Sequence, residues 1–342
     1  MCRSINKGVS LQIGCSLISN FLFSIHGNTM ASNVPIIKLN SGYDFPAIGY
    51  GTFGGPHAPE QVYHGTKHAL EAGYRHIDTA YVYETEEAVG KAVRESGIDR
   101  KDIFITTKLF QTFHEPKHVR PAFDISLKLL GVEYVDLYLM HWPFAWEFHG
   151  YSFDDIKGHK DENGHRKRID VSIVDTYRAM EELVKAGVVK SIGVSNFTIP
   201  MLEQILKECD IPPAVNQVEI HPSLPQEELL AWCKEHNIVL TAYSPLGNPG
   251  HRGQPAMMDH PAVLSAAKKY NVSPVQVLLN WGVSRGYTVI PKSVTPERIK
   301  ANLARIEMDK DDIEAIASIG REHPHRICDP IKIFGPAFNI FD

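Results

Sequence analysis

The chain has 342 residues, of which 43% are hydrophobic and 22% charged, and its formal net charge is −5. This composition is that of a globular protein with a large core, and it gives no reason to expect a nucleic acid or an anionic membrane as partner. The five cysteines are scattered and form no CxxC pair, which argues against a disulfide framework or a structural zinc site and favours a reducing compartment. Length alone fits either two average domains or one large barrel.

The first 29 residues differ from the rest of the chain. No carboxylate precedes Asp44, and residues 11–25 are largely apolar. Two interpretations remain open: the stretch is a signal or organelle-targeting segment, or Met30 is the true start and an added extension precedes it. The apolar run is too short and too polar to predict a membrane span. We therefore expect an extension at 1–29 followed by one domain at 30–342.

From residue 46 onward, β-branched and apolar runs alternate with amphipathic stretches, which predicts alternating strands and helices. Ser172 and Pro59 stand where an N-cap and a first-turn proline belong. Four predicted helices end at a glycine, the usual left-handed stop signal, at Gly73, Gly97, Gly131 and Gly187. The predicted strands are 46–53, 75–78, 103–108, 135–142, 191–196, 214–220, 239–245 and 287–293. The predicted helices are 59–73, 85–97, 116–131, 172–187, 199–209, 226–237, 260–270 and 272–286.

Eight units of this kind predict an α/β fold, a closed (β/α)8 TIM barrel whose parallel strands are covered by helices. Two polar or Gly/Pro-rich insertions, 146–170 and 247–259, follow the fourth and seventh strands. Long loops at one end of a barrel are commonly lids over a site. After Ser318 no strong periodicity continues, so we expect the C-terminal tail to pack across the barrel mouth as a third lid.

One glycine motif favours a different fold. Residues 49–54, GYGTFG, satisfy the G-x-G-x-x-G pattern of a dinucleotide-binding Rossmann domain, and Asp78 lies at a tolerable distance for its ribose-binding acid. However, the sequence GPHAP after Gly54 delays the helix that should receive the pyrophosphate. The Rossmann interpretation also leaves the later strand–helix units unexplained.

Four polar residues stand at or just beyond the ends of consecutive predicted strands. Asp78, Lys108 and His141 follow strands two, three and four, and Tyr83 lies on the loop after strand two. In a barrel these ends face one mouth, so the four side chains should meet. Their types suit carbonyl reduction: a phenol gives a proton, a cation makes the phenol more acidic, a carboxylate fixes the cation, and a neutral imidazole orients the carbonyl.

The motifs that carry these residues resemble the aldo-keto reductase family over roughly residues 33–342. The matching segments are 73–90, 137–143, 190–197, 215–222 and 289–302. The resemblance implies NADPH-dependent reduction of an aldehyde or ketone, such as a sugar aldehyde, a glyceraldehyde-like compound or a xenobiotic carbonyl. It implies Tyr83 as general acid, Lys108 and Asp78 as its modulators, His141 as the carbonyl-orienting residue, and Trp142 as a wall of the substrate pocket. Phe53, where many members carry Trp, alters that wall.

The resemblance also implies a set of residues that bind NADPH. Ser195, Asn196 and Gln217 would hold the nicotinamide carboxamide, and the ring would stack on Tyr243. Lys292 and Arg298 suit a 2′-phosphate, so NADPH should be preferred to NADH. Ala301 replaces a glutamate that is common beside the adenine. The remaining expected contacts are Ser244, Pro245, Leu246, Ile290, Pro291, Ser293 and Asn302.

Other features bear on partners and on alternative functions. His64 and His68 share a helix face at a spacing that can bind zinc, but no third ligand is near them, so no metal is expected. A non-catalytic cofactor-binding subunit or sensor on the same fold is the alternative function. Family resemblance implies a monomer, and the cytoplasm is the expected location. Within the tail, Cys328, Phe334 and Phe338 are candidate pocket residues.

Overall fold

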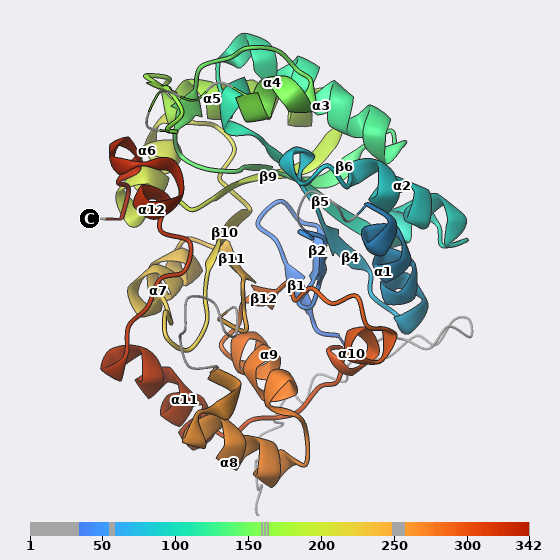
Figure 1. Ribbon diagram of the computed structural model, residues 1–342, viewed down its shortest axis with the longest axis vertical. Helices are drawn as coiled ribbons and strands as arrows, with labels where there is room; N and C mark the ends of the chain where they lie inside the picture. Colours follow the sequence, from blue (N-terminus) through green and yellow to red (C-terminus); the bar gives the residue numbers. More distant parts are fainter. Residues whose placement is uncertain are drawn as a thin grey trace, which may run out of the picture. The chain divides into compact units, whose positions relative to one another are not determined.

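The structure is a computed structural model, and it describes residues 34–54, 59–158, 160, 162, 164–247 and 257–341. The predicted extension at 1–29 and most of the 247–259 insertion lie outside these residues. Eight parallel strands form one sheet in the order β12-β11-β10-β9-β6-β5-β4-β3. A parallel bridge between Ile48 and Val289 joins its two edges, so the sheet closes into the predicted (β/α)8 barrel (Figure 1). The strands are β3 (Tyr50–Gly51), β4 (His76–Asp78), β5 (Phe104–Leu109), β6 (Val135–Met140), β9 (Val189–Ser195), β10 (Val215–Glu219), β11 (Val239–Tyr243) and β12 (Thr288–Val289).

The first predicted strand, 46–53, was wrong in its extent. Its beginning belongs to β2 (Asp44–Pro46), which pairs antiparallel with β1 (Ile36–Lys38), and only Tyr50–Gly51 joins the barrel. The hairpin covers the amino ends of the barrel strands. Phe45 is fully buried there, with its ring 4.8 Å from that of Phe104. The turn lies at Gly42, whose φ of 87° favours glycine.

A ring of helices surrounds the barrel (Figure 1). The predicted stops at Gly73, Gly97, Gly131 and Gly187 all have positive φ, and the Ser172 side chain accepts hydrogen bonds from two backbone amides at the start of α5. Within the described residues, no helix combines the length and apolar character that a membrane crossing requires. The helices that match predictions are α1 (Pro59–Ala72), α2 (Glu86–Glu95), α3 (Pro116–Leu130), α5 (Ile173–Lys185), α6 (Ile199–Glu208), α7 (Glu227–Glu235), α8 (Pro261–Tyr270) and α9 (Pro274–Ser284).

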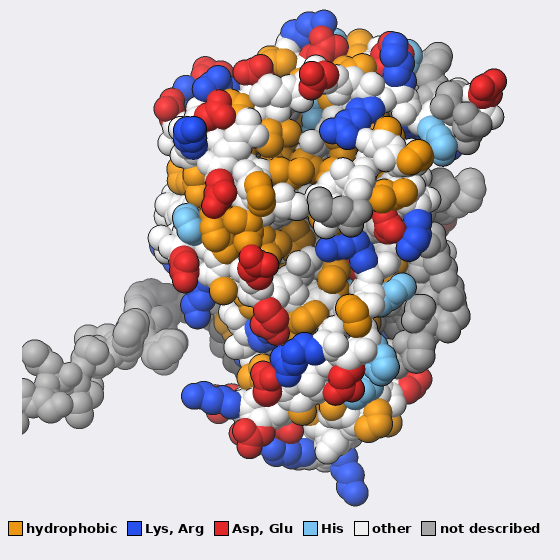
Figure 2. Space-filling view, turned by 90° about the vertical axis from the view of Figure 1, so that its left-hand side faces the viewer, with side chains coloured by type: hydrophobic (Ala, Val, Ile, Leu, Met, Phe, Trp, Pro, Cys, Tyr) orange, Lys and Arg blue, Asp and Glu red, His pale blue; other side chains and the backbone are white. Residues whose placement is uncertain are grey.

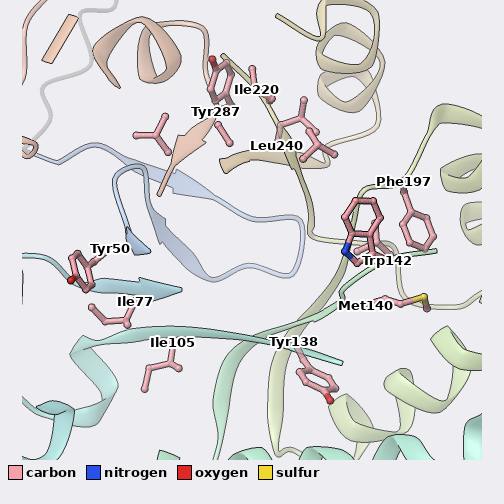
Figure 3. Packing of buried hydrophobic residues seen from close by; sticks show 14 of the residues in the cluster. Tyr50, Ile77, Ile105, Tyr138, Met140, Trp142, Phe197, Ile220, Leu240 and Tyr287 are labelled. Atoms are coloured by element: carbon pink, nitrogen blue, oxygen red, sulfur yellow. The ribbon is translucent and has the colours of Figure 1, made fainter. Parts of the chain in front are cut away.

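The core lies between the barrel strands and these helices (Figure 3). Tyr138 on β6 meets Phe123 on α3 edge-on, with ring centroids 4.9 Å apart. Both rings are almost fully buried, and each such side chain stabilises the fold by about 1.5–3 kcal/mol. This packing fixes the carboxyl ends of the strands, where the polar side chains that are predicted to form the active site lie.

The C-terminal region contains helices that the sequence did not predict. After α10 (Pro296–Ala301) come α11 (Lys310–Glu322) and a short α12 (Pro330–Phe334), followed by a 3-10 turn at Pro336–Phe338. The insertion after β6 carries β7 (Ala145–Trp146), β8 (Arg168–Ile169) and α4 (Phe153–Gly158). Phe334 packs edge-on against Trp146, at 5.1 Å between centroids, so the tail and this insertion form one aromatic junction at the mouth.

Candidate active site

Parallel strand pairing brings the four predicted polar residues to one end of the barrel. Asp78 ends β4, Lys108 lies near the end of β5, and His141 directly follows β6. Tyr83 ends a 3-10 turn, Tyr81–Tyr83, just after β4. Because β4, β5 and β6 are neighbours in register, the side chains converge although they are up to 63 positions apart in the chain (141 − 78).

Asp78 and Lys108 form a buried ion pair. The Lys108 Nζ donates to Asp78 Oδ1 at 2.6 Å and to the Thr79 carbonyl at 2.8 Å. Gln217 Nε2 donates to the second carboxylate oxygen at 2.7 Å, so both oxygens of Asp78 have partners. Burial works to lower the pKa of Lys108, but the charges of Asp78 and Tyr83 and the hydrogen bonds to both together outweigh burial, so the pKa is raised. Lys108 is therefore held charged and fixed in direction, as predicted.

Tyr83 contacts both the cation and the imidazole. Lys108 hydrogen-bonds to its hydroxyl, and the Lys108 Nζ lies 5.0 Å from the ring centroid. The ring of His141 stands nearly perpendicular to that of Tyr83, at 5.8 Å. Burial raises the pKa of Tyr83, whereas Lys108 lowers it, and the net direction is upward. Lys108 thus lowers the pKa of Tyr83 as predicted, but burial, which was not foreseen, raises it by more.

His141 is held as a neutral imidazole, as predicted. Its pKa lies well below the usual range because of burial first, and then because of the Lys108 and His114 charges. The Nδ1 atom is buried and has no hydrogen-bond partner among the described residues. The backbone carbonyl of His141 accepts a hydrogen bond from Asn196 Nδ2 at 3.0 Å. His141 can thus offer an N–H to an oxygen in the mouth without carrying charge.

A second cluster lies beside the first, at the ends of β9, β10 and β11. The Tyr243 hydroxyl donates to Asn196 Oδ1 at 2.7 Å, and Asn196 Nδ2 also contacts Ser195 Oγ at 3.1 Å. Ser195 Oγ donates to the Gln217 carbonyl at 2.7 Å. Asn196 has a φ of 66°, a conformation that asparagine tolerates better than most residues. Flat amide groups and one aromatic face therefore stand together, which suits an uncharged, planar ligand group.

Both clusters open into one cavity of about 740 Å³. Lys108 does not line it because that side chain lies behind Asp78 and Tyr83. Ser293, Arg298 and Asn302 do not line the cavity either, and Asn302 is buried. Lys292 does line it. The side chains of Lys292 and Arg298 are exposed, and neither has a hydrogen-bond or ion-pair partner among the described residues. The predicted residues that line the cavity are Phe53, Asp78, Tyr83, His141, Trp142, Ser195, Asn196, Gln217, Tyr243, Ser244, Pro245, Leu246, Ile290, Pro291 and Lys292.

Away from the two polar clusters, the cavity is lined mainly by apolar side chains. Hydrophobic side chains also gather on the outer face seen in Figure 2, which carries α12. Phe53 is 64% exposed and packs against Tyr83 at 5.0 Å. The tail contributes Cys328 and Phe334 as predicted, whereas Phe338 is buried behind them and does not line the cavity. Sequence reasoning missed Phe110 and Trp146; Phe110, two positions after Lys108 at the end of a predicted strand, could have been found.

Comparison with known proteins is consistent with this geometry. The model of the aldo/keto reductase family matches residues 47–321. A glycerol 2-dehydrogenase (NADP(+)) of Saccharomyces cerevisiae is 42% identical over 299 residues, which is 86% of this chain and 93% of the yeast protein. A D/L-glyceraldehyde reductase of Hypocrea jecorina is 41% identical, over 89% of this chain and 92% of that protein. The solved aldose reductase of Schistosoma japonicum superimposes with a TM-score of 0.82 at 36% identity, covering 90% of this chain and 99% of that one.

Proposed function

Because the chain belongs to the aldo/keto reductase family, we propose that it reduces an aldehyde or ketone to the alcohol with NADPH, using Tyr83 as the general acid. The observation that carries this proposal is the buried Asp78–Lys108 pair beneath the Tyr83 hydroxyl, with a neutral His141 beside it. A phenol, a fixed cation and an uncharged N–H donor around one cavity supply what protonation of a carbonyl oxygen needs.

The residues around the second cluster fit a nicotinamide cofactor. Ser195, Asn196 and Gln217 offer hydroxyl and amide groups to a carboxamide, and the Tyr243 ring offers a flat face. When bound, NADPH supplies the hydride. The side chains of Lys292 and Arg298 are exposed and have no partner within the part of the chain that the structure describes, so both can pair with a 2′-phosphate. Ser244, Pro245 and Leu246 would border the pyrophosphate, and Ile290, Pro291, Ser293 and Asn302 the adenosine end.

The protein groups divide the work on the substrate. His141 donates a hydrogen bond that orients the carbonyl, and Tyr83 gives its proton as negative charge develops on the oxygen. Burial keeps the phenol protonated beforehand, and Lys108 stabilises the phenolate that remains. Asp78 holds Lys108 in place. Phe53 and Trp142 form apolar walls for the rest of the substrate, which we place broadly among sugar aldehydes, glyceraldehyde-like compounds and xenobiotic carbonyls.

The test is NADPH oxidation followed at 340 nm with wild type and Tyr83→Phe across aldehydes, ketones and aldoses. We expect the variant to lose turnover while its NADPH affinity, measured by fluorescence titration, stays nearly unchanged. Tyr81→Phe is a matched control because this neighbouring tyrosine donates to the Tyr151 carbonyl and does not line the cavity. Wild type that binds NADPH but turns over no carbonyl would replace this proposal with a binding or sensor role.

We extend the proposal to the state of the protein in the cell. Residues 30–342 would form the catalytic domain, which would act as a monomer in the cytoplasm. Sedimentation of the full chain and fractionation of its native cells would test these two points independently of activity.

A further inference from the structure

The C-terminal tail crosses the cavity mouth between α11 and α12. Ile327 and Cys328 line the cavity from this segment, and Ile333 and Phe334 line it from α12. Phe334 also meets Trp142 edge-on, with 5.3 Å between ring centroids, so the tail forms part of the cavity wall. The position of this segment therefore decides the shape of the apolar end of the cavity.

A buried carboxylate binds this segment just before α12. Glu219, the last residue of β10, accepts hydrogen bonds from the backbone amides of Ile327 and Cys328, each at 2.7 Å, one through each carboxylate oxygen. Its side chain is fully buried, and His221 Nε2 lies 2.8 Å from the first oxygen. A buried charge is costly unless it is paired and hydrogen-bonded, and here the two tail amides supply hydrogen bonds beside the one that His221 makes.

Other contacts join the C-terminal region to the loop between β10 and α7. The His325 amide donates to the Ser223 carbonyl at 2.9 Å. Gly320 in α11 lies so close to the loop that an added Cβ would stand 2.5 Å from the Pro222 carbonyl oxygen and 2.4 Å from Pro225. The residues that follow β10 therefore pack against the C-terminal region, and the Glu219 carboxylate binds the tail through two hydrogen bonds.

Glu219 is also linked, through its strand β10, to the residues around Asp78 and Tyr243. Two residues before Glu219 on the same strand, Gln217 holds Asp78. Because side chains alternate along a strand, both residues point to the same side of β10. The Cys328 thiol hydrogen-bonds with the Tyr243 hydroxyl, which in turn donates to Asn196. One short strand thus positions both Asp78, the carboxylate that holds Lys108, and the tail that lines the cavity.

We propose that Glu219 is a positioning residue for substrate specificity, which fixes the tail across the cavity by clamping the amides of Ile327 and Cys328. Glu219 does not line the cavity, so it acts through the tail and not by touching substrate. This inference rests on the proposed reductase function. It predicts that loss of the clamp changes the KM for large carbonyl substrates and leaves the hydride and proton transfer groups in place.

The experiment compares full-length wild type, Glu219→Gln and Glu181→Gln. A glutamine keeps the shape, but its NH2 group cannot accept from a backbone N–H, so one of the two amides loses its acceptor. Glu181 is a matched control because it is also buried and accepts from the Ile211 amide at 2.7 Å, far from the cavity lining. Each protein is assayed with a short aldehyde and with a bulky aromatic aldehyde at saturating NADPH.

We expect Glu219→Gln to raise the KM for the bulky aldehyde by about tenfold, while the KM for the short one changes less than about twofold. NADPH affinity by fluorescence should stay near that of wild type. Brief trypsin treatment should cut faster after Arg326, within the loosened segment. Glu181→Gln should show none of these changes.

Unchanged selectivity and unchanged cleavage in a folded Glu219→Gln protein would overturn the inference. If that variant does not fold, Glu219→Asp is used, since a carboxylate shortened by one methylene cannot reach both amides. Equal KM changes for both aldehydes would indicate a general structural role and would also overturn it. Wild type without turnover would instead refute the reductase function, so the two failures are distinguishable.

Discussion

Replacing Lys108 by methionine tests the electrostatic part of the site directly. The ammonium stands 5.0 Å from the Tyr83 ring centroid. Taking that separation for unit charges and an effective dielectric constant of about 20, the cation stabilises the phenolate by about 3 kcal/mol. This corresponds to about 2 pKa units. Lys108→Met should therefore make Tyr83 a much weaker acid and reduce kcat for carbonyl reduction by about a hundredfold.

The same substitution also affects folding, and the assay must separate the two effects. Removing one partner of a buried ion pair destabilises a protein by about 3–5 kcal/mol, although Gln217 remains as a donor to Asp78. Turnover is therefore measured at a temperature where circular dichroism shows the variant folded. Lys190→Met is the control: its Nζ lies 2.8 Å from buried Asp136, which retains Arg100 at 2.7 Å, and it is remote from the cavity. A folded Lys108→Met enzyme with kcat within threefold of wild type would refute this account of the acid.

Three further outcomes follow from particular groups. Lys292→Met should raise the KM for NADPH about tenfold or more and leave that for NADH nearly unchanged, and equal changes would contradict 2′-phosphate recognition. Burial raises the pKa of Glu86 to about 7, so its contribution to stability is present below about pH 4.5 and is lost as pH rises through 7. Urea unfolding should then show Glu86→Gln gaining up to about 3 kcal/mol over wild type at pH 8 relative to pH 4.5. Burial lowers the pKa of His76 to about 4, so wild type should lose up to about 3 kcal/mol between pH 6.5 and 4, a loss that His76→Gln should not show.

The barrel could be predicted because its signals are local. Each long strand is a buried apolar run, and glycines such as Gly131 end helices wherever a left-handed residue is needed. The meeting of the candidate catalytic residues could be predicted for a related reason. Parallel strand ends share one mouth, so Asp78, Lys108 and His141 had to converge once the fold was known.

The parts that escaped prediction depend on contacts distant in sequence. The β1–β2 hairpin is short, and its burial comes from Phe45 meeting residues that lie 30 or more positions away. The helix α12 is too short to show a pattern, whereas the amphipathic spacing of α11, with Ile316, Ala317 and Ile319 buried, could have been recognised. The tail is held in place by Glu219, about a hundred residues earlier in the chain, and by aromatic contacts with the insertion after β6. Such partners cannot be paired from one sequence because no local spacing connects them.

The pKa of Tyr83 illustrates why residue types alone do not decide the electrostatics of the site. The sequence identified the cation that lowers this pKa, but the opposing effect of burial depends on how completely the surrounding chain covers the phenol. Because burial prevails, the proposed mechanism has the proton stay on Tyr83 until a substrate oxygen gains negative charge. In that mechanism Lys108 acts mainly on the phenolate formed as the proton leaves, so we expect its contribution in the rate of the chemical step and not in the charge of the resting enzyme.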